Sequence, residues 1–120
     1  MGQAGKFLRR IGAEDGYSAS GYAHYCPACQ GMHAFAVDKP FRNGAQWTFD
    51  GNIDAPTFQP SMNIKIGPDD EDGGRIDVCH YRLIAGKLLY QSDCTHALKG
   101  QTIPLPELPE GMRDGKETNL

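Results

Sequence analysis

The chain has 120 residues, and its 15 acidic and 12 basic side chains give a formal net charge of −3 with its 4 histidines neutral. This length suits one domain with a modest core, to which a bound metal ion would add useful stability. No stretch approaches the ~20 consecutive apolar residues of a membrane span, and the N-terminus lacks the apolar region of a secretory signal. We therefore expect a protein that neither crosses a membrane nor is secreted by a signal peptide.

The first predicted segment is a flexible basic arm over residues 1–20. It carries Lys6, Arg9 and Arg10 among several Gly and Ala residues, with only weak helical patterning. Three positive charges are a weak indication of contact with nucleic acid. The domain itself is expected over residues 21–103.

The pattern then becomes that of β-strands around a tight turn. Residues 21–25 and 33–37 flank a turn that contains Cys26-Pro-Ala-Cys29. Two intervening residues let both sulfur atoms reach one metal ion, so the spacing predicts a zinc knuckle. Thioredoxin-like redox chemistry is less favoured, because no helical period follows Cys29.

The middle of the chain predicts two further strands. Residues 47–49 form a short apolar strand before the turn signal Asp-Gly-Asn, and residues 62–66 alternate as a half-buried strand does. Between them lie Thr57 and Ser61, whose hydroxyls either satisfy turn backbone or line a site. The acidic run at residues 69–72 is expected to be a solvated loop.

The second half predicts a β-hairpin, with strands over residues 78–84 and 87–91 joined by Ala85-Gly86. If Ile84 pairs with Lys87, side-chain alternation divides the hairpin into two faces. One face carries Cys79, Tyr81, Leu83, Leu88, Tyr90 and Cys94, and the other carries His80, Arg82, Leu89 and Asp93. Cys79 and His80 are therefore not expected to bind the same ion.

Two features complete the predicted fold. Asp93 can cap a short helix over residues 95–99 that stops at Gly100. The closely spaced prolines after residue 103 favour an extended tail over residues 104–120. The fold class is thus mainly β: a small zinc-stapled antiparallel domain with a knuckle, a hairpin, one short helix and extended tails.

All the sulfur and imidazole ligands lie in three clusters, and such a composition favours a tetrahedral Zn²⁺ site. The simplest ligand set uses every thiol: Cys26, Cys29, Cys79 and Cys94. His96 and then His80 are the alternatives for the fourth ligand, whereas His24 and His33 are interpreted as surface or outer-sphere imidazoles. A disulfide between Cys79 and Cys94 is the alternative without metal.

Known catalytic motifs are absent from the sequence. It has no zinc-deaminase pattern, no His-Glu-x-x-His, no phosphate-binding glycine loop and no Gly-x-Ser-x-Gly elbow. If the chain is an enzyme, His80, Asp93 and His96 are the candidate catalytic residues, and His80 with Asp93 could form a polar pocket with Thr57 or Ser61. Because no Glu accompanies any His, the balance favours a protein without catalytic activity.

Five motifs in order support a resemblance. They are Cys26-Pro-Ala-Cys29 with His33, Trp47-Thr-Phe-Asp-Gly-Asn52, Pro56-Thr-Phe-Gln-Pro-Ser61, Cys79-His-Tyr81 and Asp93-Cys-Thr-His-Ala-Leu-Lys-Gly-Gln-Thr102. This series resembles a small phage and prophage protein family whose members are often labelled ammonia monooxygenase. The label does not suit a lone small domain, so the resemblance implies a phage origin but no established activity.

The leading hypothesis is a phage-encoded accessory protein with structural zinc, which binds another protein of the virion or of the host. It would act in the host cytoplasm or in the virion. The first alternative is a zinc-dependent hydrolase or a nucleotide-acting anti-defence enzyme centred on His80, Asp93 and His96. The second is a nucleic-acid-binding module that resembles a zinc ribbon.

Overall fold

The computed structural model describes residues 3–13, 16–66 and 77–110, which form two antiparallel β-sheets. Sheet A has the order β1-β2-β3-β4, and sheet B has the order β5-β6-β7-β8-β9. The strands of sheet A are β1 (Gln3–Ala4), β2 (Leu8–Ile11), β3 (Ser20–Cys26) and β4 (Gly31–Lys39). Those of sheet B are β5 (Thr48–Phe49), β6 (Phe58–Ile66), β7 (Asp77–Ile84), β8 (Lys87–Tyr90) and β9 (Thr102–Pro104). The predicted mainly β, antiparallel fold class is confirmed.

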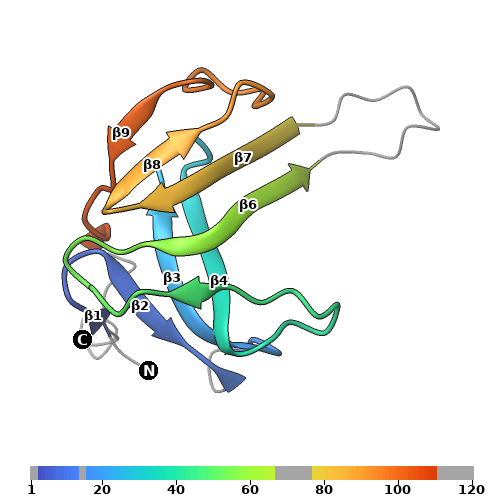
Figure 1. The fold of residues 1–120 in the computed structure, drawn as a ribbon, viewed down its shortest axis with the longest axis vertical. Coiled ribbons are helices and arrows are strands. Elements are labelled where there is room, and N and C mark those ends of the chain that lie inside the picture. The colour runs from blue at the N-terminus through green and yellow to red at the C-terminus, as the bar shows by residue number, and fades with distance from the viewer. Residues whose placement is uncertain (1–2, 14–15, 67–76, 111–120) are drawn as a thin grey trace.

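The core lies between the two sheets. Figure 1 shows that β6 and β7 of sheet B run across β3 and β4 of sheet A at a steep angle. The rings of Phe35 on β4 and Phe58 on β6 stack with centroids 4.3 Å apart, and Phe49 stacks on the other side of Phe58 at 4.6 Å. Offset aromatic stacking of this kind adds to the free energy gained by burying the rings.

The predicted hairpin forms in the predicted register. Ile84 pairs with Lys87, and the two turn residues Ala85 and Gly86 have φ angles of 51° and 75°. Two positive φ angles are typical of a type I′ turn, whose twist matches that of the strands it joins. The face expected to be apolar is buried: Cys79, Tyr81, Leu83, Leu88, Tyr90 and Cys94 are all at most 4% exposed.

The prediction of a short helix over residues 95–99 is wrong. Residues 97–100 form turns, because Thr95 N–H donates to the Val78 carbonyl and Gly100 N–H donates to the Gln91 carbonyl. These two bonds return the segment to sheet B before a helical ladder can start. No described residue lies in a helix long and apolar enough to cross a membrane.

The segments on either side of the expected domain also differ from expectation. Leu8–Ile11, expected in the flexible arm, is the strand β2, which pairs with β3 and buries Leu8 and Ile11. After β9, the chain stays extended but packs on the core through Leu105 and Leu108. Residues 69–72, the acidic run, lie outside the described residues, as do residues 111–120.

An irregularity in β6 positions the site described below. Phe58 pairs with Leu83 and Met62 pairs with Tyr81, so β6 has residues 59–61 where β7 has only Arg82. The Gln59–Pro60 peptide bond within this bulge is cis. Bulges redirect side chains and are common beside active sites. Here Phe58 and Met62 are both buried, whereas Ser61 lies on the outer face of sheet B beside β7.

The close approach of β3 and β4 at Gly21 gives a first prediction. A Cβ atom at this position would overlap the Phe35 carbonyl oxygen and come within 2.8 Å of the Val37 nitrogen. We expect Gly21→Ala to reduce the free energy of unfolding by about 2 kcal/mol or more, since backbone atoms must move. The matched control is Gly31→Ala, where the nearest atom is 3.9 Å away. Equal thermal unfolding midpoints for the two variants would contradict this packing.

Candidate active site and metal centre

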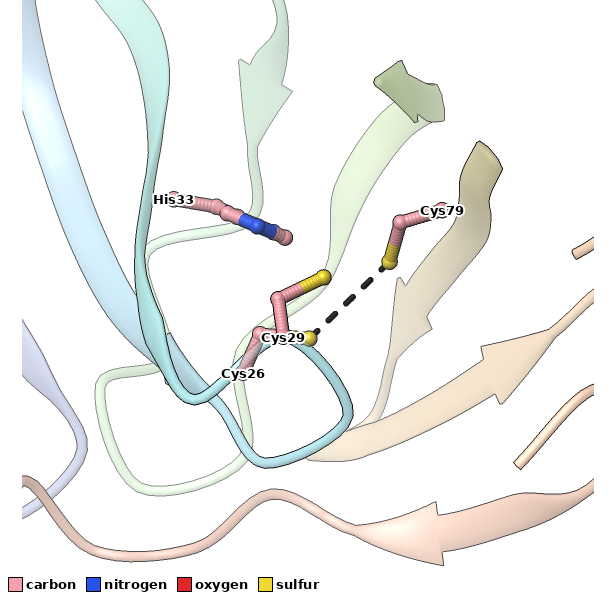
Figure 2. Close-up of side chains that lie close together, drawn as sticks. All are labelled: Cys26, Cys29, His33 and Cys79. Carbon is pink, nitrogen blue, oxygen red and sulfur yellow. Dashed lines mark hydrogen bonds between the residues drawn. The ribbon is translucent and has the colours of Figure 1, made fainter. Parts of the chain in front are cut away.

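Four metal-ligating side chains meet between the two sheets. Cys26 and Cys29 come from the β3–β4 turn, His33 from β4 and Cys79 from β7, and their ligand atoms all lie within 4.8 Å of one another. Figure 2 shows the three sulfur atoms converging with the His33 ring. Cys26 and Cys79 are buried, with their sulfur atoms 3.9 Å apart, whereas Cys29 is partly exposed. Three thiols and one imidazole are a donor set that suits a tetrahedral metal ion.

A hydrogen-bond relay determines which His33 nitrogen faces the thiols. His24 Nδ1 lies 3.1 Å from the Tyr25 carbonyl, which can only accept, so this nitrogen carries the proton. His24 is fully buried, and burial lowers its pKa to about 3, so its Nε2 is an unprotonated acceptor. The Tyr81 hydroxyl, 2.6 Å away, must then donate to His24 Nε2.

The relay ends at His33. Because the Tyr81 hydroxyl proton is used on His24, its oxygen accepts a hydrogen bond from His33 Nδ1–H at 3.2 Å. Burial also lowers the pKa of His33, so the ring is neutral and Nε2 keeps its lone pair. A metal-ligating histidine generally donates its second ring N–H in this way. The residues therefore fit a metal ion with His33 Nε2 as a ligand.

One of the three thiols, that of Cys26, is already arranged to hold negative charge. A hydrogen bond from the Cys79 thiol is the main cause that lowers the pKa of Cys26 to about 5, and Tyr90 Oη also donates to Cys26 Sγ at 3.1 Å. The pKa of Cys79 is correspondingly raised, and burial raises that of Cys29 to about 11. A bound cation would favour the thiolate form of all three, because metal ligation requires deprotonated sulfur.

The structure places the other expected ligands elsewhere. Cys94 is buried, but its Sγ donates to the His80 carbonyl at 3.1 Å and accepts from the His80 N–H at 3.3 Å. His33 takes its place in the metal group. All four cysteines are free thiols, so Cys79 and Cys94 form no disulfide.

His96 lies next to the metal group without belonging to it. Its ring packs edge-on against Tyr90 at 4.7 Å, and with Cys29 and Cys79 it lines a cavity of about 260 Å³. Its Nε2 atom is buried without a hydrogen-bond partner among the described residues. An unpaired buried nitrogen beside thiols indicates that this cavity favours a polar or charged occupant.

A second polar site lies on the opposite face of β7. Ser61 Oγ donates to His80 Nε2 at 3.1 Å, and His80 Nδ1 donates to both Asp93 carboxylate oxygens at 3.1 and 3.0 Å. These three residues form the serine–histidine–aspartate set of a nucleophile, a general base and a carboxylate that orients the base. Alternation along β7 separates this set from the metal group, since Cys79 points inward and His80 outward.

His80 is held through both its backbone and its ring. The Cys94 thiol bonds to its N–H and carbonyl, and Gln91 N–H donates to the same carbonyl at 2.8 Å. The ring is fixed by Ser61 and Asp93. The β6 bulge supplies Ser61, and the turn after β8 supplies Asp93.

Sequence reasoning found part of this site. It placed His80 and Asp93 on one face and offered Thr57 or Ser61 as their neighbour. The structure brings Ser61 to His80, whereas Thr57 Oγ1 accepts from Ala85 N–H at 2.8 Å and so satisfies the turn. Within the described part of the chain His96 forms no hydrogen bond with His80 or Asp93, and it lies on the metal side of β7. No nucleophile motif in the sequence identifies Ser61.

The outer face of sheet B thus has the side-chain arrangement of a serine hydrolase. The chain belongs to the family described as bacterial ubiquitination-like system serine protease (BubE), whose model matches residues 3–90. That match includes Ser61 and His80 and ends just before Asp93. No curated protein and no solved structure matches the chain.

The family match overturns the functional hypothesis drawn from the sequence. The chain is not a phage-encoded zinc module for protein binding, because it belongs to a serine protease family. The alternatives, a zinc-dependent hydrolase and a nucleic-acid-binding module, find no support in the family description. The metal site itself is supported by the grouping of three cysteines and His33. The resemblance to the phage family stays a prediction.

The metal group predicts which thiols bind the ion. We expect Cys26→Ser and Cys79→Ser to lose bound metal, and Cys94→Ser to keep it, because the Cys94 thiol bonds to the His80 backbone and lies outside the metal group. The measurement is metal per chain by elemental analysis of reduced, purified protein. Loss of metal in Cys94→Ser with retention in His33→Ala would contradict the ligand set.

The relay predicts a role for the Tyr81 hydroxyl in metal affinity. Tyr81→Phe removes the acceptor of His33 Nδ1–H, and we expect the metal dissociation constant to rise about 10- to 100-fold, as for other outer-sphere partners of histidine ligands. Competition with a chromophoric chelator measures this constant. Tyr17→Phe, at an exposed ring, is the control. An unchanged constant in a folded Tyr81→Phe protein would refute the relay.

Proposed function

We propose that this chain is a serine protease of a bacterial ubiquitination-like system, with Ser61 as nucleophile, His80 as general base and Asp93 as orienting carboxylate. The observation that carries the proposal is the unbroken hydrogen-bonded series from Ser61 Oγ through the His80 ring to the Asp93 carboxylate. The family description supplies the type of reaction and of system.

The geometry suits acyl transfer. As Ser61 Oγ attacks a carbonyl carbon, His80 Nε2 accepts the hydroxyl proton and then gives it to the leaving group. An ester between Ser61 and the acyl part of the substrate results. Water, deprotonated by the same nitrogen, attacks this ester, releases the acid and restores the serine hydroxyl. The Asp93 carboxylate keeps the proton of neutral His80 on Nδ1, so Nε2 is free to accept.

Asp93 differs from a buried triad carboxylate. Its side chain is 56% exposed, whereas that of His80 is 25% exposed. Solvent weakens the interaction of an exposed carboxylate with imidazolium, so Asp93 acts mainly by orienting the ring. The Cys94 thiol adds to this by fixing the His80 backbone from the residue next to Asp93.

For the metal centre we propose zinc, because three thiolates and one imidazole are a donor set that structural zinc sites use. Cys26, Cys29, His33 and Cys79 would hold it. When bound, the ion supplies a cross-link between the β3–β4 turn and β7. Cys79 and Tyr81 flank His80 in sequence and both belong to the network around the metal group, so β7 is anchored on either side of the proposed base.

The nucleophile assignment is tested with a fluorophosphonate probe, which labels activated serines covalently. We expect the unmodified protein to be labelled at Ser61 and Ser61→Ala not to be labelled. Hydrolysis of p-nitrophenyl acetate should fall by about 10³-fold or more in Ser61→Ala and His80→Ala, since loss of either residue disables the same step. Asp93→Asn should cost less, about 10- to 100-fold, because its carboxylate is exposed.

The matched control is Ser92→Ala, which removes an exposed serine that has no hydrogen bond to a histidine among the described residues. Mass spectrometry of the labelled peptide locates the modified residue. Labelling elsewhere, or equal hydrolysis by Ser61→Ala and the unmodified protein, would refute the assignment.

A further inference from the structure

One edge of sheet B is open beside Ser61. On the side of β6 away from β7, the short strand β5 pairs only with Phe58 and Gln59. From Ser61 onward, no described strand pairs with that side of β6. In Figure 1, β5 ends near the start of β6, and the rest of β6 continues past it as the edge of the sheet.

The register shows which backbone groups face this open edge. The N–H and carbonyl of His80 bond to the Cys94 thiol and to Gln91, on the side of β7 away from β6. Asn63 and His80 are therefore an antiparallel pair without mutual hydrogen bonds, and the Asn63 backbone groups point away from β7. By the same alternation, those of Lys65 point outward too. No hydrogen bond among the described residues uses these groups, and both residues are exposed.

The unpaired stretch of β6 ends at Ser61. The indole N–H of Trp47 donates to the Ser61 carbonyl at 3.2 Å, so Trp47 occupies the position where a neighbouring strand would continue. A chain added along Asn63 and Lys65 must leave the plane of the sheet at Ser61. It can leave only on the outer face, because Phe58 and Met62 fill the other face with core. On the outer face it meets Ser61 Oγ and His80.

We propose that the protease binds its substrate as an extended polypeptide segment added antiparallel to β6, with the residues before the scissile bond paired to Asn63 and Lys65. This inference rests on the proposed function. An antiparallel segment that reaches Ser61 with its carbonyl must run from Lys65 toward Asn63, so the paired residues belong to the acyl part. Addition of a strand to an open edge gives affinity through main-chain hydrogen bonds and is a common mode of peptide recognition.

The probes are p-nitrophenyl esters, whose reactivity makes hydrolysis measurable without knowledge of the natural substrate. The series contains p-nitrophenyl acetate and acetylated glycine esters extended to two, three and four residues. For the unmodified protein we expect kcat/KM to rise about 10-fold or more from one residue to four, since the added residues form main-chain hydrogen bonds with β6. In esters of one length, an N-methyl group is placed at each amide in turn. We expect the gain in kcat/KM to be lost when the methylated amide would pair with β6, and to be kept when the next amide along the segment is methylated.

The protein-side test is Asn63→Pro, which removes the outward N–H without breaking the β6–β7 ladder. We expect it to lose the rise in kcat/KM with peptide length, measured as the ratio of the values for the four-residue ester and p-nitrophenyl acetate. Asn63→Ala, which keeps the N–H, should keep the gain. If Asn63→Pro fails to fold, the N-methyl esters assayed with the unmodified protein test the addition of a strand to β6 instead.

The outcomes separate the two proposals. Ser61-dependent hydrolysis that does not depend on peptide length, or N-methyl groups without an alternating effect, would overturn edge binding and leave the protease assignment intact. Hydrolysis that is the same in Ser61→Ala as in the unmodified protein would overturn the protease assignment and edge binding with it.

Discussion

The two-residue period of β7 is the constraint on which the rest of the molecule depends. Successive side chains of a strand point to opposite faces, so Cys79 and Tyr81 enter the core while His80 faces outward. One short strand thereby serves both a metal group and a serine–histidine–aspartate set without mixing them. A shift of one residue in the β6–β7 register would exchange the two faces and destroy both sites together.

Local patterns were enough to predict the hairpin, the Cys-x-x-Cys turn and the separation of Cys79 from His80. The remaining features depend on contacts between distant residues. His33 becomes a ligand candidate because Tyr81 and His24, from other strands, fix its tautomer. Ser61 reaches His80 because the β6 bulge turns it outward. Neither the relay nor the bulge has a signal in the spacing of residues. The expected helix failed for the same reason, since backbone bonds to Val78 and Gln91 outweigh a favourable cap.

The metal group compensates for the small size of the domain. A domain of this length buries a limited core, and a catalytic base must be held within a fraction of an ångström. On the inner face of β7, Tyr81 packs against aromatic rings of His24, His33, Phe35 and Tyr90. A metal ion held by Cys79 and the β3–β4 turn would cross-link the strand next to His80 to sheet A.

The open position of the site also bears on how a substrate is recognised. Asp93 is more than half exposed and Ser61 lies on the outer face of a sheet, whereas the cavity of about 260 Å³ lies beside Cys29, Cys79 and His96 on the other side of β7. Neither Ser61 nor Asp93 lines that cavity. Main-chain groups can supply affinity for a substrate, because the outward N–H and carbonyl groups of Asn63 and Lys65 form a row that starts next to Ser61. A protease organised in this way would select an extended, accessible segment of polypeptide.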